Sequence, residues 1–180
     1  RPGIYEFPFG VTVAEVLEAA GARDTQAMTS AGAAGHCLST DEFGRRIAFE
    51  DVATGGSIMV FDQSRDMFEV ARNFAHFFAH ESCGFCTPCR VGTAVNARLL
   101  DKLAADHGSP YDLDEIVKMH RLMQGASHCG LGNTATIAID DMLVKFRPAF
   151  DRRLHSPEYE PAFDLAAALS QARRMTGRDD

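Results

Sequence analysis

The chain has 180 residues, of which 46% are hydrophobic and 24% are charged, and its net charge is −7. This composition is ordinary for a folded globular protein. The chain is long enough for one domain or two small ones. The acidic balance argues against a nucleic-acid-binding surface, and no apolar run reaches the roughly 20 residues that a membrane-spanning helix needs. No signal-like apolar run follows Arg1, so we predict a cytoplasmic protein without direct membrane insertion. Because the first residue is not methionine, we expect either a processed chain or a piece of a longer protein.

Residues 1–62 predict a small α/β unit. Residues 3–9 alternate loosely, as a strand does. Thr12, with Glu15 three positions later, has the pattern of a capping box, so a helix is expected to begin there. Residues 57–61 follow a glycine pair and are apolar throughout, which predicts a short buried strand.

Helical periodicity begins at Asp66, where apolar residues recur at every third or fourth position. The buried face of this first helix is predicted to carry Met67, Val70, Ala71, Phe74, Phe77 and Phe78. Thr87 and Pro88 predict the N-cap and first residue of a second helix. Its apolar positions are Val91, Val95, Leu99 and Leu103.

Asp112 is predicted to cap a third helix, and a fourth is expected from Asp140 onward, with Pro148 bending or stopping it. The whole chain therefore predicts an α+β fold, in which the small N-terminal unit precedes a four-helix bundle over residues 66–154. Residues 155–180 are expected to form a tail with one amphipathic helix.

Three of the five cysteines, Cys83, Cys86 and Cys89, form a C-x-x-C-x-x-C run. Thiolates at this spacing can hold three corners of a cubane, as they do in ferredoxin-type sites. Cys129 stands about 40 positions later and supplies a fourth sulfur. We therefore predict that these four cysteines are the cofactor-binding and metal-ligating residues of one 4Fe–4S cluster. No residue is predicted to act as a catalytic acid, base or nucleophile.

The surroundings of the cysteine run suit an anionic cluster. A helix that begins near Pro88 places Cys89 in its first turn, where free N–H groups and the helix dipole stabilise negative charge. Glycines at 84, 130 and 132 allow the backbone to approach closely. Arg90 is either a nearby positive charge or a solvated side chain.

One alternative to the cluster and two further residues also need to be considered. Zinc is the main chemical rival, although zinc sites usually pair two separated C-x-x-C knuckles or mix cysteine with histidine. Cys37 stands alone in the N-terminal unit, and we expect it to be a small core residue. His128 is expected to lie beside the centre and not to bind it.

The segment Glu81–Gly92 keeps Glu81, Ser82, Gly84, Pro88, Arg90 and Gly92 around its three cysteines, and Cys129 is followed by Leu131 and Gly132. These motifs resemble the signature of the NADH-oxidising flavoprotein subunit of complex I, NAD-reducing hydrogenases and NAD-dependent formate dehydrogenases. The resemblance implies a β-grasp-like, soluble-ligand-binding domain over residues 1–62, then an iron–sulfur helical bundle. It covers the chain up to about Leu154.

No glycine-rich phosphate-binding loop is present in the sequence. The resemblance therefore concerns the C-terminal half of such a subunit, and FMN and NAD(H) are implied only for a missing N-terminal part. The implied function is a one-electron relay between the flavin and further centres of a multisubunit complex. The implied partners are other redox subunits, including ferredoxin-like iron–sulfur subunits.

A soluble NAD-reducing hydrogenase or formate dehydrogenase is the preferred assignment. A fragment of the complex I subunit, an electron-carrier adaptor that lacks the flavin half, and a stand-alone binding module with a structural cluster are the alternatives.

Overall fold

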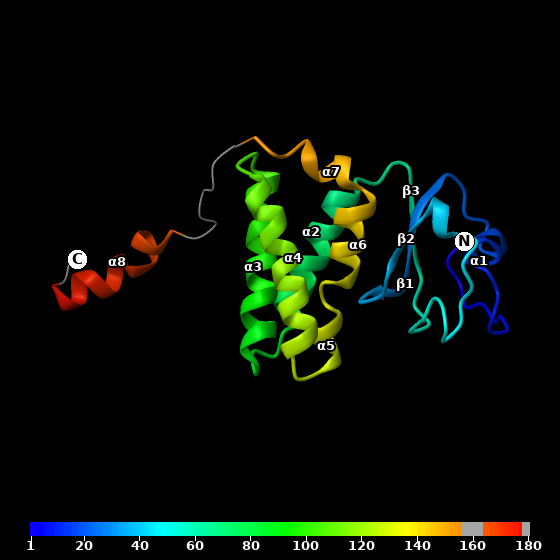
Figure 1. The fold of residues 1–180 in the computed structure, drawn as a ribbon, viewed down its shortest axis with the longest axis horizontal. Coiled ribbons are helices and arrows are strands. Elements are labelled where there is room, and N and C mark those ends of the chain that lie inside the picture. The colour runs from blue at the N-terminus through cyan, green and yellow to red at the C-terminus, as the bar shows by residue number, and fades with distance from the viewer. Residues whose placement is uncertain (156–163, 178–180) are drawn as a thin grey trace.

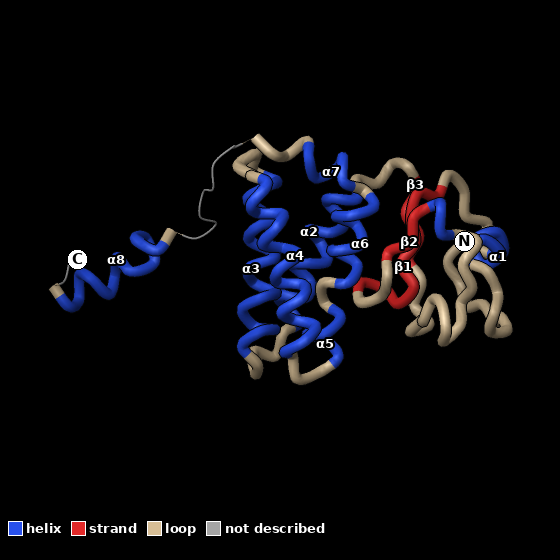
Figure 2. The backbone as a smooth tube through the Cα atoms, viewed as in Figure 1, coloured by secondary structure: helices blue, strands red, loops and turns tan. Residues whose placement is uncertain are grey.

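A three-stranded sheet from the N-terminal part lies beside a bundle of helices (Figure 1). The computed structural model describes residues 1–155 and 164–177. The strands form one layer and the helices stand next to it (Figure 2). The predicted α+β class is confirmed, whereas the predicted tail over 155–180 lies partly outside the described residues. No helix in the described ranges is both long and apolar enough to cross a membrane.

The sheet has the order β2-β1-β3, and both pairs of strands are antiparallel. The strands are β1 (Thr25–Ala33), β2 (Cys37–Ser39) and β3 (Met59–Asp62). Met28 pairs with Leu38, and both belong to the N-terminal core, whereas their neighbours Ala27 and Cys37 belong to the core of the bundle. Because successive side chains in a strand point to opposite faces, β1 and β2 are buried on both sides.

The N-terminal unit confirms the predicted helix and corrects both predicted strands. Helix α1 (Val13–Ala19) begins at Thr12, and its capping box with Glu15 is complete. Residues 3–9 form no strand, and Ile4 is fully exposed. The strand predicted over 57–61 begins instead at Met59. Its residues are largely exposed, in contrast to those of β2, the other edge strand of the sheet.

Four longer helices of the second part pack around a common core. They are α2 (Met67–Glu81), α3 (Thr87–Ala104), α4 (Pro110–Ala126) and α6 (Ile137–Lys145). The shorter elements are η1 (Thr40–Glu42), α5 (Gly130–Thr134) and α7 (Arg147–Asp151). Helix α8 (Leu165–Thr176) begins after its N-cap residue Asp164 and lies apart from the bundle in Figure 1.

The predicted helix starts are correct only to within a few residues. The N-cap of α3 is Cys86 and not Thr87. Ser109 caps α4, while Asp112 is the third helical residue and completes a capping box with it. The fourth helix begins before Asp140, at Ile137.

Two apolar side chains assigned to the core lie on the surface. Phe77 of α2 is 49% exposed and Val91 of α3 is 46% exposed. Phe74 and Phe78 of α2 are buried as predicted. The apolar residues of α2 and α3 thus spread over more of each helix surface than the neighbouring helices cover.

A buried ion pair joins α3 to α4. The ammonium group of Lys102 lies 2.9 Å from both carboxylate oxygens of Asp112, whose side chain is fully buried. The same carboxylate accepts hydrogen bonds from the backbone N–H and hydroxyl of Ser109. These bonds satisfy a charge that would otherwise be costly to bury.

We expect Lys102→Met to lower the free energy of unfolding by about 3–5 kcal/mol, because it leaves the Asp112 carboxylate buried without its cation. Denaturant titration measures the loss. Lys118→Met is the matched control, since Lys118 is exposed and pairs with Glu115 on the surface of α4. The control should change stability by less than about 1 kcal/mol. Equal losses in the two variants would contradict this role of Lys102.

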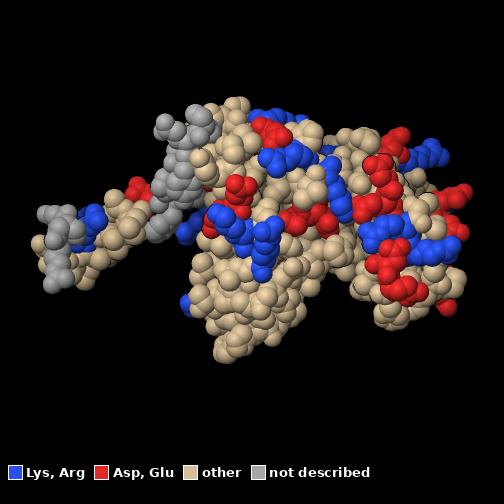
Figure 3. Space-filling model, viewed as in Figure 1, with Lys and Arg blue, Asp and Glu red and all other residues tan. Residues whose placement is uncertain are grey.

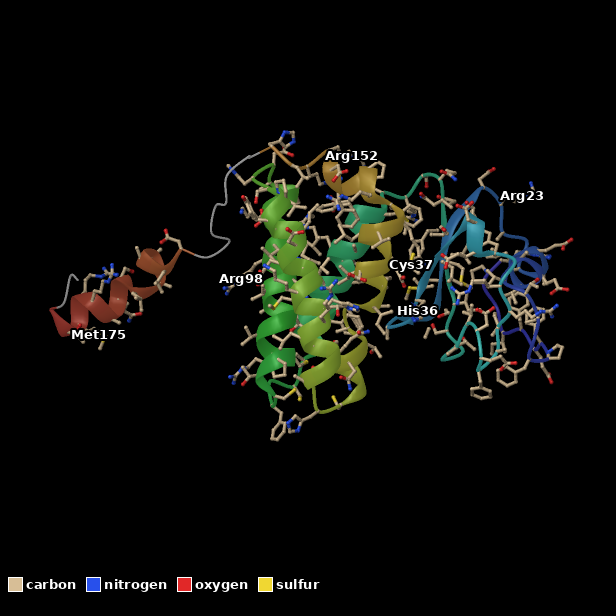
Figure 4. The ribbon with its side chains drawn as sticks, viewed as in Figure 1. Arg23, His36, Cys37, Arg98, Arg152 and Met175 are labelled. Atoms are coloured by element: carbon tan, nitrogen blue, oxygen red, sulfur yellow. The ribbon has the colours of Figure 1, made fainter. Side chains whose placement is uncertain are left out.

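A polar network joins the sheet to the bundle. Asp141 of α6 accepts hydrogen bonds from the His36 ring and the Cys37 N–H, at 2.9 and 3.0 Å. Lys145, one turn further along α6, lies 3.2 Å from Asp141 and 2.8 Å from Glu42. The hydrogen bond to Asp141 raises the pKa of His36. Figure 4 shows His36 at this junction.

This network predicts a pH-dependent contribution to stability. Because its folded-state pKa is raised, His36 stabilises the fold fully below its unfolded pKa of about 6.5, and this contribution is lost as pH rises through the raised pKa. The difference in unfolding free energy between the parent and His36→Gln should therefore be larger near about pH 5.5 than near about pH 8.5. Denaturant titrations at both pH values measure it, with His80→Gln on the surface of α2 as control. A difference that grows with pH would contradict the assignment.

Candidate metal centre

The two cysteine-bearing loops lie at one end of the bundle, where α2 ends and α3 and α5 begin (Figure 1). The loop between α2 and α3 carries Cys83 and Cys86, and Cys129 ends the loop between α4 and α5. The ring of Phe85, from the first loop, meets the ring of His128, from the second, with centroids 5.4 Å apart. The loops are therefore in direct contact.

Two of the cysteines occupy N-cap positions, Cys86 before α3 and Cys129 before α5. Neither helix start has a side-chain capping bond. Cys89 lies in the first turn of α3, as the sequence predicts, although the cap of this helix stands one residue earlier than expected. The first turn of a helix presents N–H groups without intrahelical partners, and these favour negative charge.

Backbone N–H groups are directed at the sulfur of Cys86. Hydrogen bonds from backbone N–H groups lower the pKa of this thiol; the N–H of His128 has the larger effect and the N–H of Cys89 the smaller. The donors come from both loops, so the contact between the loops also stabilises the thiolate. Thiolate is the form of cysteine that binds metals. His128 therefore contributes a backbone donor, and its ring packs against Phe85.

The cysteines differ in exposure. Cys89 is buried, Cys86 is half-buried, and Cys83 and Cys129 are exposed. The hydroxyl of Thr93 donates to the carbonyl oxygen of Cys89 at 2.8 Å. The four cysteines therefore range from the buried Cys89 in the core of the bundle to Cys83 and Cys129 at its surface.

Close backbone packing surrounds Cys89. A Cβ at Gly132 would lie 3.0 Å from the Cβ of Cys89 and 2.5 Å from the Cβ of Ser127. Gly132 thus allows α5 to approach the first turn of α3 more closely than a larger residue would. At Gly84 the reason for glycine is different, because its φ of +77° lies in the left-handed region.

Cys37 lies elsewhere, between the sheet and the bundle (Figure 4). It is fully buried, and burial raises the pKa of its thiol to about 12. Cys37 is therefore a core residue, as predicted. Within residues 1–155 and 164–177, no group of three or more histidine, cysteine, aspartate or glutamate side chains has the arrangement for a single metal ion.

The cysteine end of the bundle is nearly bare of charged side chains on the face in view, whereas charges cover the opposite end and the sheet unit (Figure 3). Two hydroxyls near the cysteines were not assigned a role from the sequence. Ser82 lies 3.4 Å from the sulfur of Cys89, and the Ser127 side chain packs at Gly132. Ser82 belongs to the cysteine motif itself, whereas the place of Ser127 directly after α4 is the signal that could have indicated it.

Residues 69–153 match the family model of the NADH-ubiquinone oxidoreductase-F iron-sulfur binding region. The alpha subunit of the NAD-reducing hydrogenase HoxS of Cupriavidus necator is 39% identical over 172 residues, which cover 94% of this chain and 29% of that subunit. The F subunit of the NADH-quinone oxidoreductase of Escherichia coli is 32% identical over 169 residues, which cover 87% of this chain and 38% of that protein.

The fold agrees with these matches. A crystal structure of an NAD+-reducing NiFe-hydrogenase in the H2-reduced state has a TM-score of 0.84 and 41% identity to this chain, and covers 100% of it. The chain covers 32% of that structure and so spans about a third of the length of the relatives it matches. The resemblance to part of an NADH-oxidising subunit is confirmed.

The glycine packing at the centre gives a testable expectation. Gly132→Ala should lower the free energy of unfolding by about 1–3 kcal/mol, because the new methyl group meets the short, inflexible side chains of Ser127 and Cys89. Gly130→Ala, two residues earlier in the same helix, is the control, since its methyl group meets no described atom within 4 Å. Denaturant titration compares the two, and equal losses would show that the close approach at Gly132 is unimportant.

Proposed function

We propose that Cys83, Cys86, Cys89 and Cys129 hold one 4Fe–4S cluster, through which the protein relays single electrons within an NAD-linked oxidoreductase complex. The observation that carries this proposal is the contact between the two cysteine-bearing loops, in which the ring of Phe85 meets the ring of His128 with centroids 5.4 Å apart. A cysteine run and a cysteine about 40 positions away are thereby brought to one end of the bundle.

The donor set supports an iron–sulfur cluster. Cysteine thiolates are the usual ligands of 4Fe–4S clusters, and the C-x-x-C-x-x-C run is typical of them. The match of residues 69–153 to an iron–sulfur binding region supports the same cofactor independently of the spacing. Hence the cluster is preferred to zinc, whose sites usually combine two separated pairs of ligands.

The backbone around the sulfurs also fits an anionic group. N–H groups of His128 and Cys89 stabilise negative charge on Cys86, and the first turn of α3 adds its dipole. Gly132 brings α5 close to Cys89. These donors are fixed by the backbone, so they require little reorganisation when the charge at the site changes.

The exposure of the site suits electron relay. When bound, the cluster supplies one-electron chemistry, whereas NAD(H) exchanges two electrons as hydride. Cys89 anchors the site in the core, while Cys83 and Cys129 reach the surface, where a neighbouring centre can come near. The chain's residues bind and orient the group and hold it beside the surface; none of them is assigned a proton-transfer role.

The complex is proposed to be a soluble, cytoplasmic NAD-reducing hydrogenase. The HoxS alpha subunit is 39% identical to the chain, whereas the Escherichia coli quinone-oxidoreductase relative is 32% identical. FMN and NAD(H) are assigned to another part of the same subunit, and ferredoxin-like iron–sulfur subunits are the proposed partners. A role in an NADH-quinone oxidoreductase is the second candidate, supported by the relatives from that class of enzyme, and a formate dehydrogenase stays a prediction from the motif.

Single cysteine substitutions test the ligand set. We expect Cys83→Ser, Cys86→Ser, Cys89→Ser and Cys129→Ser each to lose most of the bound iron and the electron paramagnetic resonance signal of the reduced 4Fe–4S centre, because each removes one of the thiolates that hold it. Iron analysis and low-temperature spectra of the purified variants measure both.

Cys37→Ser is the matched control, because this buried thiol lies between the sheet and the bundle. It should keep the iron and the signal even where stability falls. Retention of the full signal in Cys129→Ser, with its loss in Cys37→Ser, would refute the assignment.

A further inference from the structure

Two serine hydroxyls approach the buried cysteine of the centre from different helices. Ser82 is the C-cap residue of α2 and Ser127 is the C-cap residue of α4. Both helices end at the cysteine end of the bundle, so each cap brings a hydroxyl to the first turn of α3, where Cys89 lies. Neither residue is needed as a ligand in the proposed function.

Ser82 makes a chain of two hydrogen bonds that ends on sulfur. Its hydroxyl oxygen accepts the N–H of Gly84 at 3.4 Å and lies 3.4 Å from the sulfur of Cys89. A metal-bound thiolate carries no proton, so the hydroxyl must be the donor in this contact. Because the backbone N–H polarises the hydroxyl, the bond from that hydroxyl to sulfur is strengthened.

Ser127 has a buried hydroxyl whose oxygen has no hydrogen-bond partner among the described residues. It faces the space that Gly132 leaves open, and the Cβ of Cys89 borders the same space. A buried hydroxyl without a partner costs about 1–3 kcal/mol. An acceptor at the sulfur-rich centre would remove that cost.

We infer that Ser82 and Ser127 are positioning residues that raise the reduction potential of the centre by donating hydrogen bonds to sulfur, Ser82 to the thiolate of Cys89. This inference rests on the proposed function. Reduction adds one electron, supplied by the flavin of the complex, to an already anionic site. Hydrogen bonds to sulfur stabilise the added charge, and the serines keep their protons throughout.

Redox titration of the protein in its native assembly tests the inference. Ser82→Ala and Ser127→Ala should each lower the ratio of reduced to oxidised centre at fixed ambient potential by up to about tenfold, which corresponds to about 59 mV for one electron. Ser82→Thr keeps a hydroxyl and should restore the parent ratio. Thr93→Val is the matched control, since it removes a buried hydroxyl that bonds to the carbonyl oxygen of Cys89 and not to its sulfur.

A spectroscopic measurement separates hydrogen bonding from structural support. After exchange into D2O, electron–nuclear double resonance of the reduced centre should show an exchangeable deuteron coupling that Ser82→Ala lacks. An unchanged potential and an unchanged coupling in Ser82→Ala would overturn the role of Ser82, and an unchanged potential in Ser127→Ala would overturn that of Ser127. Absence of the cluster from the parent protein would refute the proposed function itself, which is a distinguishable result.

Discussion

The close packing of α3 against α4 is the constraint on which the candidate centre depends. Gly92, one turn after Cys89, packs closely against Met123: a Cβ there would lie 2.5 Å from the sulfur of Met123, so the methionine side chain would have to shift. Met123 is fully buried near the end of α4, four residues before Ser127. The two helices therefore meet where one begins and the other ends. This approach brings the loop before α3 and the loop after α4 into contact, although they are far apart in sequence.

The electrostatic design of the site follows from the same packing. The donors that reach the cysteine sulfurs are backbone N–H groups and a serine hydroxyl. They carry partial charges in fixed positions, whereas the face in view in Figure 3 keeps its charged side chains away from this end of the bundle. Fixed dipoles near a site of changing charge stabilise it without large rearrangement. The buried charges of the bundle serve a different purpose, since Lys102 and Asp112 fasten the same pair of helices further along.

Local sequence patterns predicted much of this molecule. The capping box at Thr12 located α1, and the apolar period indicated the helices of the bundle; the cysteine spacing predicted a centre at the end of the bundle where the two cysteine-bearing loops meet. Exact helix starts were harder to predict, because Cys86 and Thr87 are both compatible with the Pro88 that follows them. The exposure of Phe77 depends on which helices cover α2, and periodicity alone carries no such information.

Long-range contacts explain the remaining differences. The hydrogen bond between His36 and Asp141 joins residues 105 positions apart, and Ser82 finds its sulfur partner only after α2 and α3 have turned back on each other. The strand expected over residues 3–9 has a loose alternation but pairs with no strand of the sheet. Alternation of apolar and polar residues is a weak signal for a strand, because it does not show which other strand the segment would pair with.

Mössbauer spectroscopy of 57Fe-enriched protein, combined with iron and sulfide analysis, tests the central claim most directly. The account predicts about four iron and about four inorganic sulfide per chain, and the spectrum of a single 4Fe–4S cubane. Stoichiometric zinc without iron, or the spectrum of a 2Fe–2S centre, would contradict it.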